Sequence, residues 1–175
     1  MTDAITVRRV APGEAEGLID ALADLLIDCV EGGASVGFML PITHERAARF
    51  WREVAGGVDR GERVLLVAHD AQGCLVGTVQ LILSLPENQP HRADVAKMQV
   101  ASRARRQGIA ARLMTHVDEE ARREGRTLLV LDAVTGGDAE RVYERAGWTK
   151  VGSIPNYALY PGGGLCATTY MYKAL

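Results

Sequence analysis

The residues with the clearest chemical potential lie in a basic turn at residues 103–111. Arg105, Gly108 and Ala110 follow the spacing [RQ]-x-x-G-x-[GA] between a predicted strand and a predicted helix. The first N–H groups of a helix have no partner inside the helix, and the helix dipole adds partial positive charge there. Such a turn can bind a phosphate group, because Gly108 and Ala110 leave the backbone open to a close approach. An ordinary basic helix cap would match the same spacing, so the motif alone leaves both interpretations open.

The turn differs from two common nucleotide-binding loops. No Gly-Lys-[Ser/Thr] follows a glycine-rich turn, which excludes a P-loop, and no GxGxxG follows a strand, which excludes the dinucleotide fingerprint. Arg103, Arg106 and Arg112 add positive charge around the turn, which favours a ligand with several phosphates. A pyrophosphate would then lie on the backbone N–H groups of residues 107–111.

A second motif, AERVYERAGW, occupies residues 139–148 and follows an apolar strand that ends at Asp132. Its alanine, tyrosine and Gly-Trp pair resemble the pattern A-x-x-[LF]-Y-x-x-x-G-[FYW] of the GNAT acetyltransferases, whose acyl-CoA loop has the first spacing. Both motifs stand in the family's order, and the resemblance covers nearly the whole chain. It implies an N-acetyltransferase that transfers acetyl from acetyl-CoA to an amine by direct attack on the thioester, with no metal.

The resemblance also implies where acetyl-CoA binds. A backbone N–H near Met98 is the expected oxyanion donor. Many family members place an asparagine three residues before Ala139, where it contacts the pantetheine arm, but this chain has Gly136 there, so that contact is not expected. The expected cofactor-binding residues are Met98, Gln99, Val100, Arg105, Arg106, Gln107, Gly108, Ile109, Ala110, Ala111, Ala139 and Tyr143.

Within the family, residues 32–39 and 92–100 are similar to the tabtoxin-resistance acetyltransferases, which acetylate a β-lactam amino-acid toxin. This similarity implies catalytic roles for Asp94, Asp132 and Tyr143. It also implies a small amino-acid-like or toxin or antibiotic acceptor, and hence a role in antibiotic or toxin resistance. The expected acceptor-binding residues are Ala34, Ser35, Val36, Phe38 and Asp94.

The chemistry of amine acetylation needs the same residue types. An amine is mostly protonated at neutral pH, so a general base must remove a proton before or during attack. Strand alternation would place Asp94 on the same face as Met98 and Val100. Asp132 ends an apolar strand, where the cleft of an α/β sheet opens. Tyr143 could donate a proton to the departing thiolate. Capping or turn roles for the aspartates, and core packing for the tyrosine, are the structural alternatives.

Other polar residues give weaker indications of function. The four histidines are isolated in sequence and show no metal-ligand spacing, and Cys29 lies on the apolar face of a predicted helix. Asn156, Tyr157 and Tyr160 are expected in a Gly/Pro-rich loop before the last strand. Loops of this kind often border an acceptor site, and a purely structural role is the alternative.

Elements with helical or strand periodicity must position these residues. Thr43 is a predicted helix N-cap, and Pro12 a predicted helix start. The fold class expected is α/β, a GNAT-like mixed sheet of about seven strands with helices on both faces, in a single domain over residues 1–175. Strands are expected at 5–10, 62–69, 74–84, 93–100, 127–132, 148–153 and 166–173, and helices at 12–31, 43–58, 108–125 and 138–146.

Composition narrows the class of protein. The 175 residues have a net charge of −2 and a pI near 6.1, so no global charge attracts nucleic acid or an anionic membrane. Three scattered cysteines and no long apolar run favour a cytoplasmic protein. The family resemblance implies a small-molecule amine as its partner. The alternatives are a protein or peptide N-acetyltransferase and a non-catalytic acyl-CoA-binding sensor. A homodimer stays open, because the sequence does not give the oligomeric state.

Overall fold

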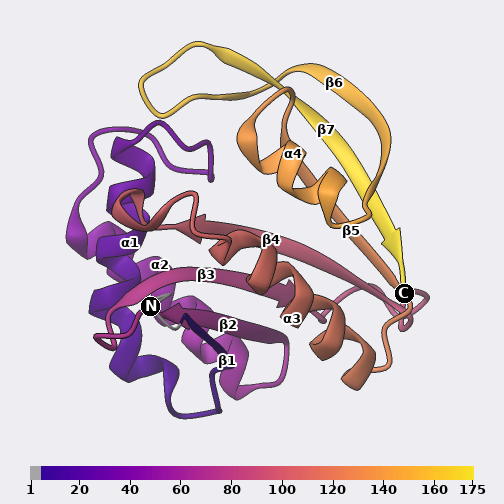
Figure 1. Cartoon of the computed structure of the whole chain (residues 1–175), viewed down its shortest axis with the longest axis horizontal. Helices are drawn as coiled ribbons and strands as arrows, with labels where there is room; N and C mark the ends of the chain where they lie inside the picture. Colours follow the sequence, from indigo (N-terminus) through magenta and orange to yellow (C-terminus); the bar gives the residue numbers. More distant parts are fainter. Residues whose placement is uncertain (1–4) are drawn as a thin grey trace.

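The computed structural model describes residues 5–175, which form one seven-stranded sheet and four α-helices (Figure 1). Residues 1–4, which the predicted domain includes, lie outside the described residues. The strands are β1 (Thr6–Arg9), β2 (Arg63–His69), β3 (Leu75–Ile82), β4 (Arg92–Val100), β5 (Leu128–Val134), β6 (Thr149–Leu159) and β7 (Leu165–Ala174). The helices are α1 (Ile19–Glu31), α2 (His44–Asp59), α3 (Ile109–Arg123) and α4 (Asp138–Arg145). The expected mixed α/β sheet is confirmed.

The sheet divides at its centre. Its strand order is β1-β2-β3-β4-β5-β7-β6, and every neighbouring pair is antiparallel except β4 and β5. These two parallel strands are paired only where residues 92–94 meet residues 128–130. Figure 1 shows them close together at their N-terminal ends and separated at their C-terminal ends. The C-terminal halves of β4 and β5 are therefore not paired with each other, and a ligand could lie between them.

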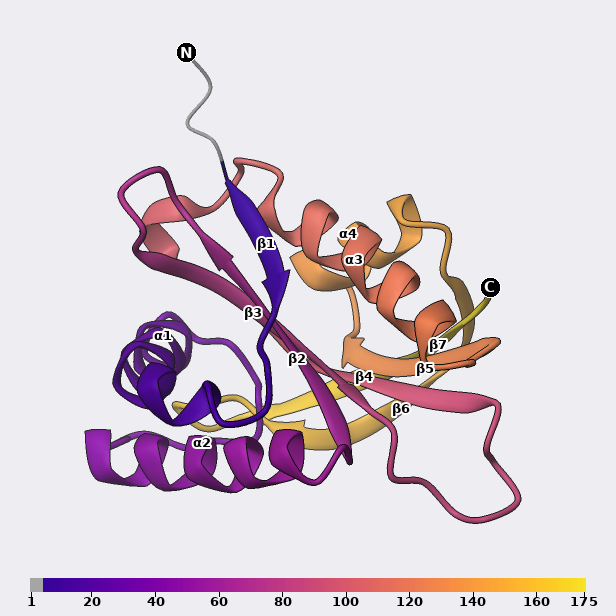
Figure 2. The same cartoon turned by 90° about the horizontal axis from the view of Figure 1, so that it is seen from below.

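Helices cover both faces of the sheet, α1 and α2 on one and α3 and α4 on the other (Figure 2). On β2, Leu65 and Val67 belong to the cluster that contains Trp51 of α2. Leu66, between them, belongs to the cluster that contains Leu113 of α3. An apolar strand whose alternate residues pack against different helices is expected for a sheet covered on both sides.

Two segments differ from the sequence prediction. The helix expected at 12–31 is α-helical only from Ile19, because Gly13 has φ +80° and residues 15–18 form a 3₁₀ turn. The strand expected at 148–153 continues to Leu159. Asn156 has φ +54°, and the ladder with β7 is irregular between Ile154 and Ala158. A proline at 155 is tolerated because β6 is the edge strand, where its missing N–H breaks no ladder bond.

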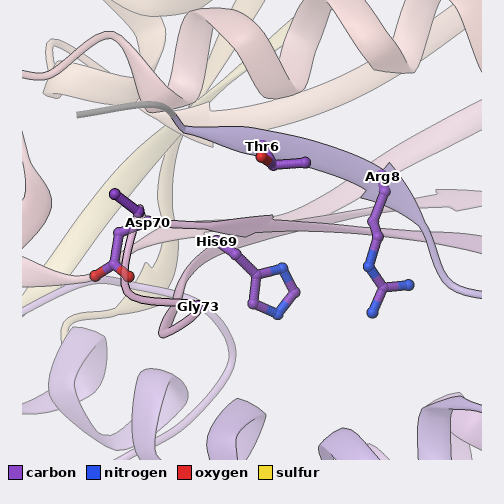
Figure 3. A pocket seen from close by; sticks show the side chains of 6 residues that line it. Thr6, Arg8, His69, Asp70 and Gly73 are labelled. Atoms are coloured by element: carbon purple, nitrogen blue, oxygen red, sulfur yellow. The ribbon is translucent and has the colours of Figure 1, made fainter. Parts of the chain in front are cut away.

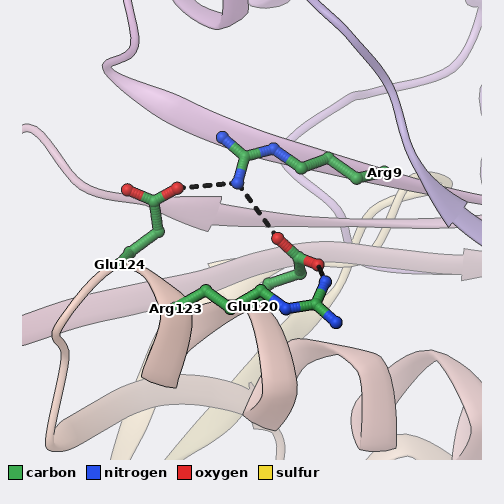
Figure 4. A network of polar contacts seen from close by, with 4 residues as sticks. All are labelled: Arg9, Glu120, Arg123 and Glu124. Carbon is green, nitrogen blue, oxygen red and sulfur yellow. Dashed lines mark hydrogen bonds and ion pairs between the residues drawn. The ribbon is translucent and has the colours of Figure 1, made fainter.

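A buried carboxylate fixes α3 against the far edge of the sheet (Figure 4). The Arg9 guanidinium of β1 donates to Glu120 at 3.0 Å and to Glu124 at 2.6 Å, and Arg123 also pairs with Glu120. The Glu120 side chain is only 6% exposed, so a charge there needs its partners. This network holds the C-terminal half of the helix whose N-terminus carries the phosphate-binding motif.

Candidate active site

A bulge in β4 shapes the centre of the site. Thr78 of β3 pairs with Gln99 and Gln80 pairs with Ala96, so Lys97 and Met98 together oppose the single residue between them on β3. Lys97 has φ +56°, a conformation that residues other than glycine rarely adopt. The extra residue reverses the alternation of side chains along the strand.

The bulge corrects one expectation. Asp94 does not share a face with Met98 and Val100, because directly opposed residues share a face and the register puts Asp94 with Ala96 and Gln99 instead. Met98 and Val100 pack against the core cluster on the α3 side. Asp94 thus faces the α1 and α2 side of the sheet, away from the side chains that follow the bulge.

The basic turn has the geometry of an anion site. Gly108 is the N-cap of α3 with φ +76°, and no side chain caps the helix. The first N–H with a helical partner is that of Arg112, which donates to the Gly108 carbonyl at 3.1 Å. The N–H groups of residues 109–111 are therefore free of helical bonds. A Cβ placed on Gly108 would meet nothing within 4 Å, so the space in front of the helix is open.

The expected acetyl-CoA residues fall into two groups. Arg105, Arg106, Gln107, Gly108 and Ala111 are exposed, and Ala110 is half-buried. The side chain of Ile109 belongs to the core, so that residue can offer only its backbone N–H. Met98, Gln99 and Val100 end β4 directly before the turn, while Ala139 and Tyr143 lie on α4, beyond β5. The predicted acetyl-CoA residues thus lie at the end of β4 or in the elements that follow β4 and β5, the two strands that diverge.

The amide of Gln99 is an unusual member of this set. Its side chain is buried at 3% exposure, and neither its nitrogen nor its oxygen has a hydrogen-bond partner among the described residues. Buried amide groups normally have hydrogen-bond partners. The unpaired Gln99 amide beside the bulge therefore fits a site at which a polar ligand would form the missing hydrogen bonds.

Tyr143 is buried next to Trp148, with ring centroids 6.0 Å apart. Burial raises the pKa of the Tyr143 phenol well above its usual value, and the negative charge of Asp132 raises it further. The hydroxyl therefore keeps its proton over the whole neutral range. This excludes Tyr143 as a general base in its neutral-pH state and leaves its hydroxyl with a proton to donate.

Three groups share one face at the divergence of the strands. Asp94 is paired in register with Val130 of β5, and Asp132 is two residues further along β5. Tyr170 of β7 stands opposite Asp132. Because residues two apart in a strand and residues directly opposed across strands share a face, Asp94, Asp132 and Tyr170 all face the α1 and α2 side. The sequence-predicted carboxylates are thus brought onto one face of neighbouring strands.

The two carboxylates have different partners. Asp94 pairs with Arg92, and its side chain is 39% exposed. Asp132 is exposed and accepts a 2.8 Å hydrogen bond from the Thr168 hydroxyl. Neither is a helix cap or a turn residue, which were the structural alternatives, since both lie inside strands.

Two tyrosines connect this face with the edge strand. The hydroxyls of Tyr157 on β6 and Tyr170 on β7 share a 2.9 Å hydrogen bond. That bond, followed by burial and by the charges of Asp132 and Asp94, raises the pKa of Tyr170. Tyr157 was expected in a loop and lies in a strand, and no motif indicated its pairing with Tyr170.

Lys97 is the residue that the sequence analysis missed. Its Nζ atom lies 5.9 Å from the centroid of the Phe50 ring, and a Cβ on Gly37 would lie 3.2 Å from it. Burial lowers the pKa of Lys97, and the charge of Asp132 opposes that effect. The only signal in the sequence was a lysine among the mostly apolar residues of a predicted strand. Such lysines are common near strand edges and turns, so this one did not indicate a site.

A surface hollow of about 430 Å³ lies beside this cluster. One wall is the 35–39 segment and the other is the β6–β7 hairpin, which meet where the Ser35 hydroxyl donates to the Leu159 carbonyl at 3.3 Å. Of the four predicted loop residues, Ser35 and Phe38 line the hollow, whereas Ala34 and Val36 pack against the core clusters. The lining residues are Ser35, Gly37, Phe38, Met39, Tyr157, Ala158, Leu159 and Leu165.

A second hollow, of about 540 Å³, lies at the other end of the sheet (Figure 3). Thr6, Arg8, His69 and Asp70 line it, beside the turn between β2 and β3. Asp70 is occupied there, since it accepts from the Arg103 guanidinium at 3.1 Å and from two backbone N–H groups of its own turn. None of the predicted site residues lines this hollow.

The described residues include neither a membrane-spanning helix nor a metal-binding cluster. Among residues 5–175, no helix is long and apolar enough to cross a membrane. Across the same described residues, no cluster of three or more His, Cys, Asp or Glu side chains could hold a metal ion.

Comparison with known proteins identifies the family. The family model described as "Acetyltransferase (GNAT) domain" matches residues 43–157. An uncharacterized N-acetyltransferase from the hisH–hisA intergenic region of Azospirillum brasilense is 36% identical over 134 residues, which cover 75% of this chain and 76% of that protein.

Solved structures share the fold at lower identity. A GCN5-related N-acetyltransferase from Kribbella flavida has a TM-score of 0.79 at 23% identity, with 98% of each chain covered. A Salmonella typhimurium protein solved with its cofactor acetyl-CoA has a TM-score of 0.79 at 16% identity, covering 98% of this chain and 94% of that one. The chain therefore belongs to the GNAT acetyltransferases and is an acetyl-CoA-dependent N-acetyltransferase.

Proposed function

We propose that the protein acetylates the amine of a small amino-acid-like acceptor, of the kind found among toxins and antibiotics. The observation that carries the proposal is the placement of Asp94, Asp132 and Tyr170 on one face of the sheet, linked through Tyr157 to a hollow of about 430 Å³. A hollow of that size suits a small molecule.

The residues present fit acetyl-CoA. The free N–H groups at the start of α3 would hold its pyrophosphate, and Arg105 and Arg106 would pair with its phosphates. The carboxyl ends of β4 and β5 would receive the pantetheine arm, with the Met98 N–H at the bulge as the expected oxyanion donor and the Gln99 amide unpaired among the described residues. Acetyl-CoA supplies an activated acetyl group as a thioester.

The chain's own groups would manage the protons. Asp132 and Asp94 would accept the proton that the acceptor ammonium must lose before attack, directly or through a water. Tyr143, whose hydroxyl stays protonated, would return a proton to the leaving sulfur. Burial raises the pKa of the Cys29 thiol to about 11, so this cysteine is not a ready nucleophile, which supports direct transfer.

Residues 1–175 would act as one acetyltransferase domain, located in the cytoplasm, where the three free cysteines suit a reducing environment.

A homodimer is also part of the proposal. The edge strand β6 exposes Val151 at 70% and Ile154 at 44%, and an open apolar edge favours pairing with a second copy. A charged substitution, Val151→Glu, should then lower the mass measured by light scattering from that of a dimer to that of a monomer. A monomeric wild type would reject this point alone.

An amine panel tests the acceptor. CoA release would be followed with β-lactam amino acids, ordinary amino acids, aminoglycosides and peptide N-termini as acceptors. The proposal expects activity with amino acids. Activity confined to peptides or aminoglycosides would reject the small amino-acid-like acceptor and favour the peptide alternative. Tight acetyl-CoA binding without CoA release for any amine would indicate a non-catalytic sensor.

A further inference from the structure

Lys97 adopts a backbone conformation that the fold must hold in place. It is the first of the two residues that make the β4 bulge, and its φ of +56° lies in the left-handed region. A non-glycine residue there is strained, and such residues gather at functional sites. The bulge directs a long cationic side chain toward α2 and the 35–39 segment, where Phe50 and Gly37 lie next to its ammonium.

The ammonium of Lys97 differs from those of the other two lysines in its partners. Lys150 has carboxylate oxygens of Glu140 and Glu144 at 2.5 Å, and Lys173 has one of Asp118 at 2.5 Å. Among the described residues, no carboxylate lies within the 4.0 Å of an ion pair from Lys97. The side chain is nevertheless half-buried, and a partly desolvated cation without a counter-ion is unfavourable.

The surroundings of Lys97 belong to the acceptor side. Gly37, on which a Cβ would lie 3.2 Å from the Lys97 ammonium, also lines the hollow. Phe38 lines it too, and its ring packs edge-to-face on Phe50 at 5.3 Å. Asp132 is the carboxylate whose charge Lys97 feels. Arg92 is already paired with Asp94, so it brings no free positive charge to this face. Lys97, Asp94 and Asp132 do not line the hollow themselves, but Gly37 beside Lys97 and Tyr157 bonded to Tyr170 do, so a cation and two carboxylates lie close behind its lining.

We propose that Lys97 is a specificity-determining residue that binds a carboxylate on the acceptor, while Asp94 and Asp132 receive the acceptor's amine. The inference rests on the proposed function and narrows it: the acceptor is an amino acid in its zwitterionic form, not a simple amine. A carboxylate supplies the counter-ion that Lys97 lacks, through charge-assisted hydrogen bonds. It also orients the amine toward the opposite group of charges.

The test compares L-amino acids with their α-carboxamides, which keep the amine and remove the negative charge. For the wild type, kcat/KM should favour the amino acid by about 10- to 100-fold, the usual range for a hydrogen bond to a charged group. Lys97→Met should remove this preference while leaving the carboxamide within about threefold of its wild-type rate, and Lys97→Arg should restore part of it. Lys150→Met, the control, removes an exposed lysine and should leave the preference unchanged.

A binding measurement separates this inference from the proposed function. N-acetylglycine carries the carboxylate but no reactive amine, and calorimetry in the presence of CoA measures its affinity without turnover. Lys97→Met should weaken that affinity at least tenfold, and Lys150→Met should not. If carboxamides and amino acids are acetylated equally well, or if Lys97→Met binds N-acetylglycine as the wild type does, the role of Lys97 is wrong while acetylation of small amines stands. If no small amine releases CoA, the proposed function fails instead, and N-acetylglycine binding alone decides whether Lys97 holds a carboxylate.

Discussion

Asp132 on β5 stands directly opposite Tyr170 on β7, and the hydroxyl of Tyr170 shares a 2.9 Å hydrogen bond with that of Tyr157. Tyr157 in turn lines the acceptor hollow. Asp132, at the divergence of β4 and β5, therefore faces the same side as a tyrosine pair that reaches the surface where an acceptor would enter. The same carboxylate also acts on Lys97 and Tyr143, which lie on different elements.

The charge of Asp132 should be measurable at Lys97. Burial lowers the pKa of Lys97 and Asp132 raises it, so Asp132→Asn should make that pKa lower still. NMR titration of the lysine side chains would show this directly, with Lys150 and Lys173 as references in the same sample. Asp94→Asn is the matched variant and should have a smaller effect. An unchanged Lys97 pKa in Asp132→Asn would place the carboxylate too far away to act on the ammonium.

The start of α3 should be the phosphate site. Gly108→Asp introduces a negative charge and a side chain at φ +76°, and it should abolish acetyl-CoA binding measured by calorimetry. Gly125→Asp is the control, because Gly125 has φ +69° and equally open surroundings at the other end of the same helix. It carries the same backbone strain but should bind normally. If Gly108→Asp binds acetyl-CoA with unchanged affinity, the pyrophosphate does not bind at the start of α3.

Tyr143 should act through its hydroxyl. Tyr143→Phe keeps the ring against Trp148 and should lower kcat by about 10²-fold, within the range of general acid catalysis. Acetyl-CoA affinity should change little. Tyr172→Phe removes the hydroxyl of an exposed tyrosine on β7 and should leave kcat unaltered. Full turnover in Tyr143→Phe would mean that the residue only packs, or that a step other than chemistry limits the rate.

Acid should weaken the turn before α4. The hydrogen bond from Lys150 lowers the pKa of Glu140, and the Gly136 N–H lowers it further. A carboxyl with a lowered folded pKa stabilises the protein above its unfolded pKa of about 4.3, and this stabilisation is lost as the pH falls through the folded value. The difference in Tm between the wild type and Glu140→Gln should therefore shrink from pH 6 to pH 3. Glu119→Gln, at an exposed position, should show no such trend, and a constant Glu140→Gln difference would refute the pairing.

Local patterns in the sequence were enough to predict most of the fold. The apolar stripe of α3 and the Thr43 N-cap of α2, which accepts from the Arg46 N–H at 3.2 Å, follow from short-range chemistry. The β4 bulge did not, because nothing in ADVAKMQV shows where a partner strand skips a residue. That single insertion put Met98 and Val100 on the face opposite to Asp94 and produced the environment of Lys97. The Tyr157–Tyr170 pair also depends on a long-range register, which spacing along one strand cannot reveal.

The most direct test of acetyl transfer by this site is a single turnover with acetyl-CoA labelled in its acetyl group. Without an acceptor, rapid quenching should find the protein unlabelled, because direct transfer leaves no acetyl group on the enzyme. After an amino acid is added, labelled N-acetyl amino acid and CoA should appear in equal amounts and at equal rates. An acetylated protein that forms first and then passes its label to the amino acid would contradict direct attack on the thioester, and the absence of any labelled amino acid would contradict the proposed acceptor.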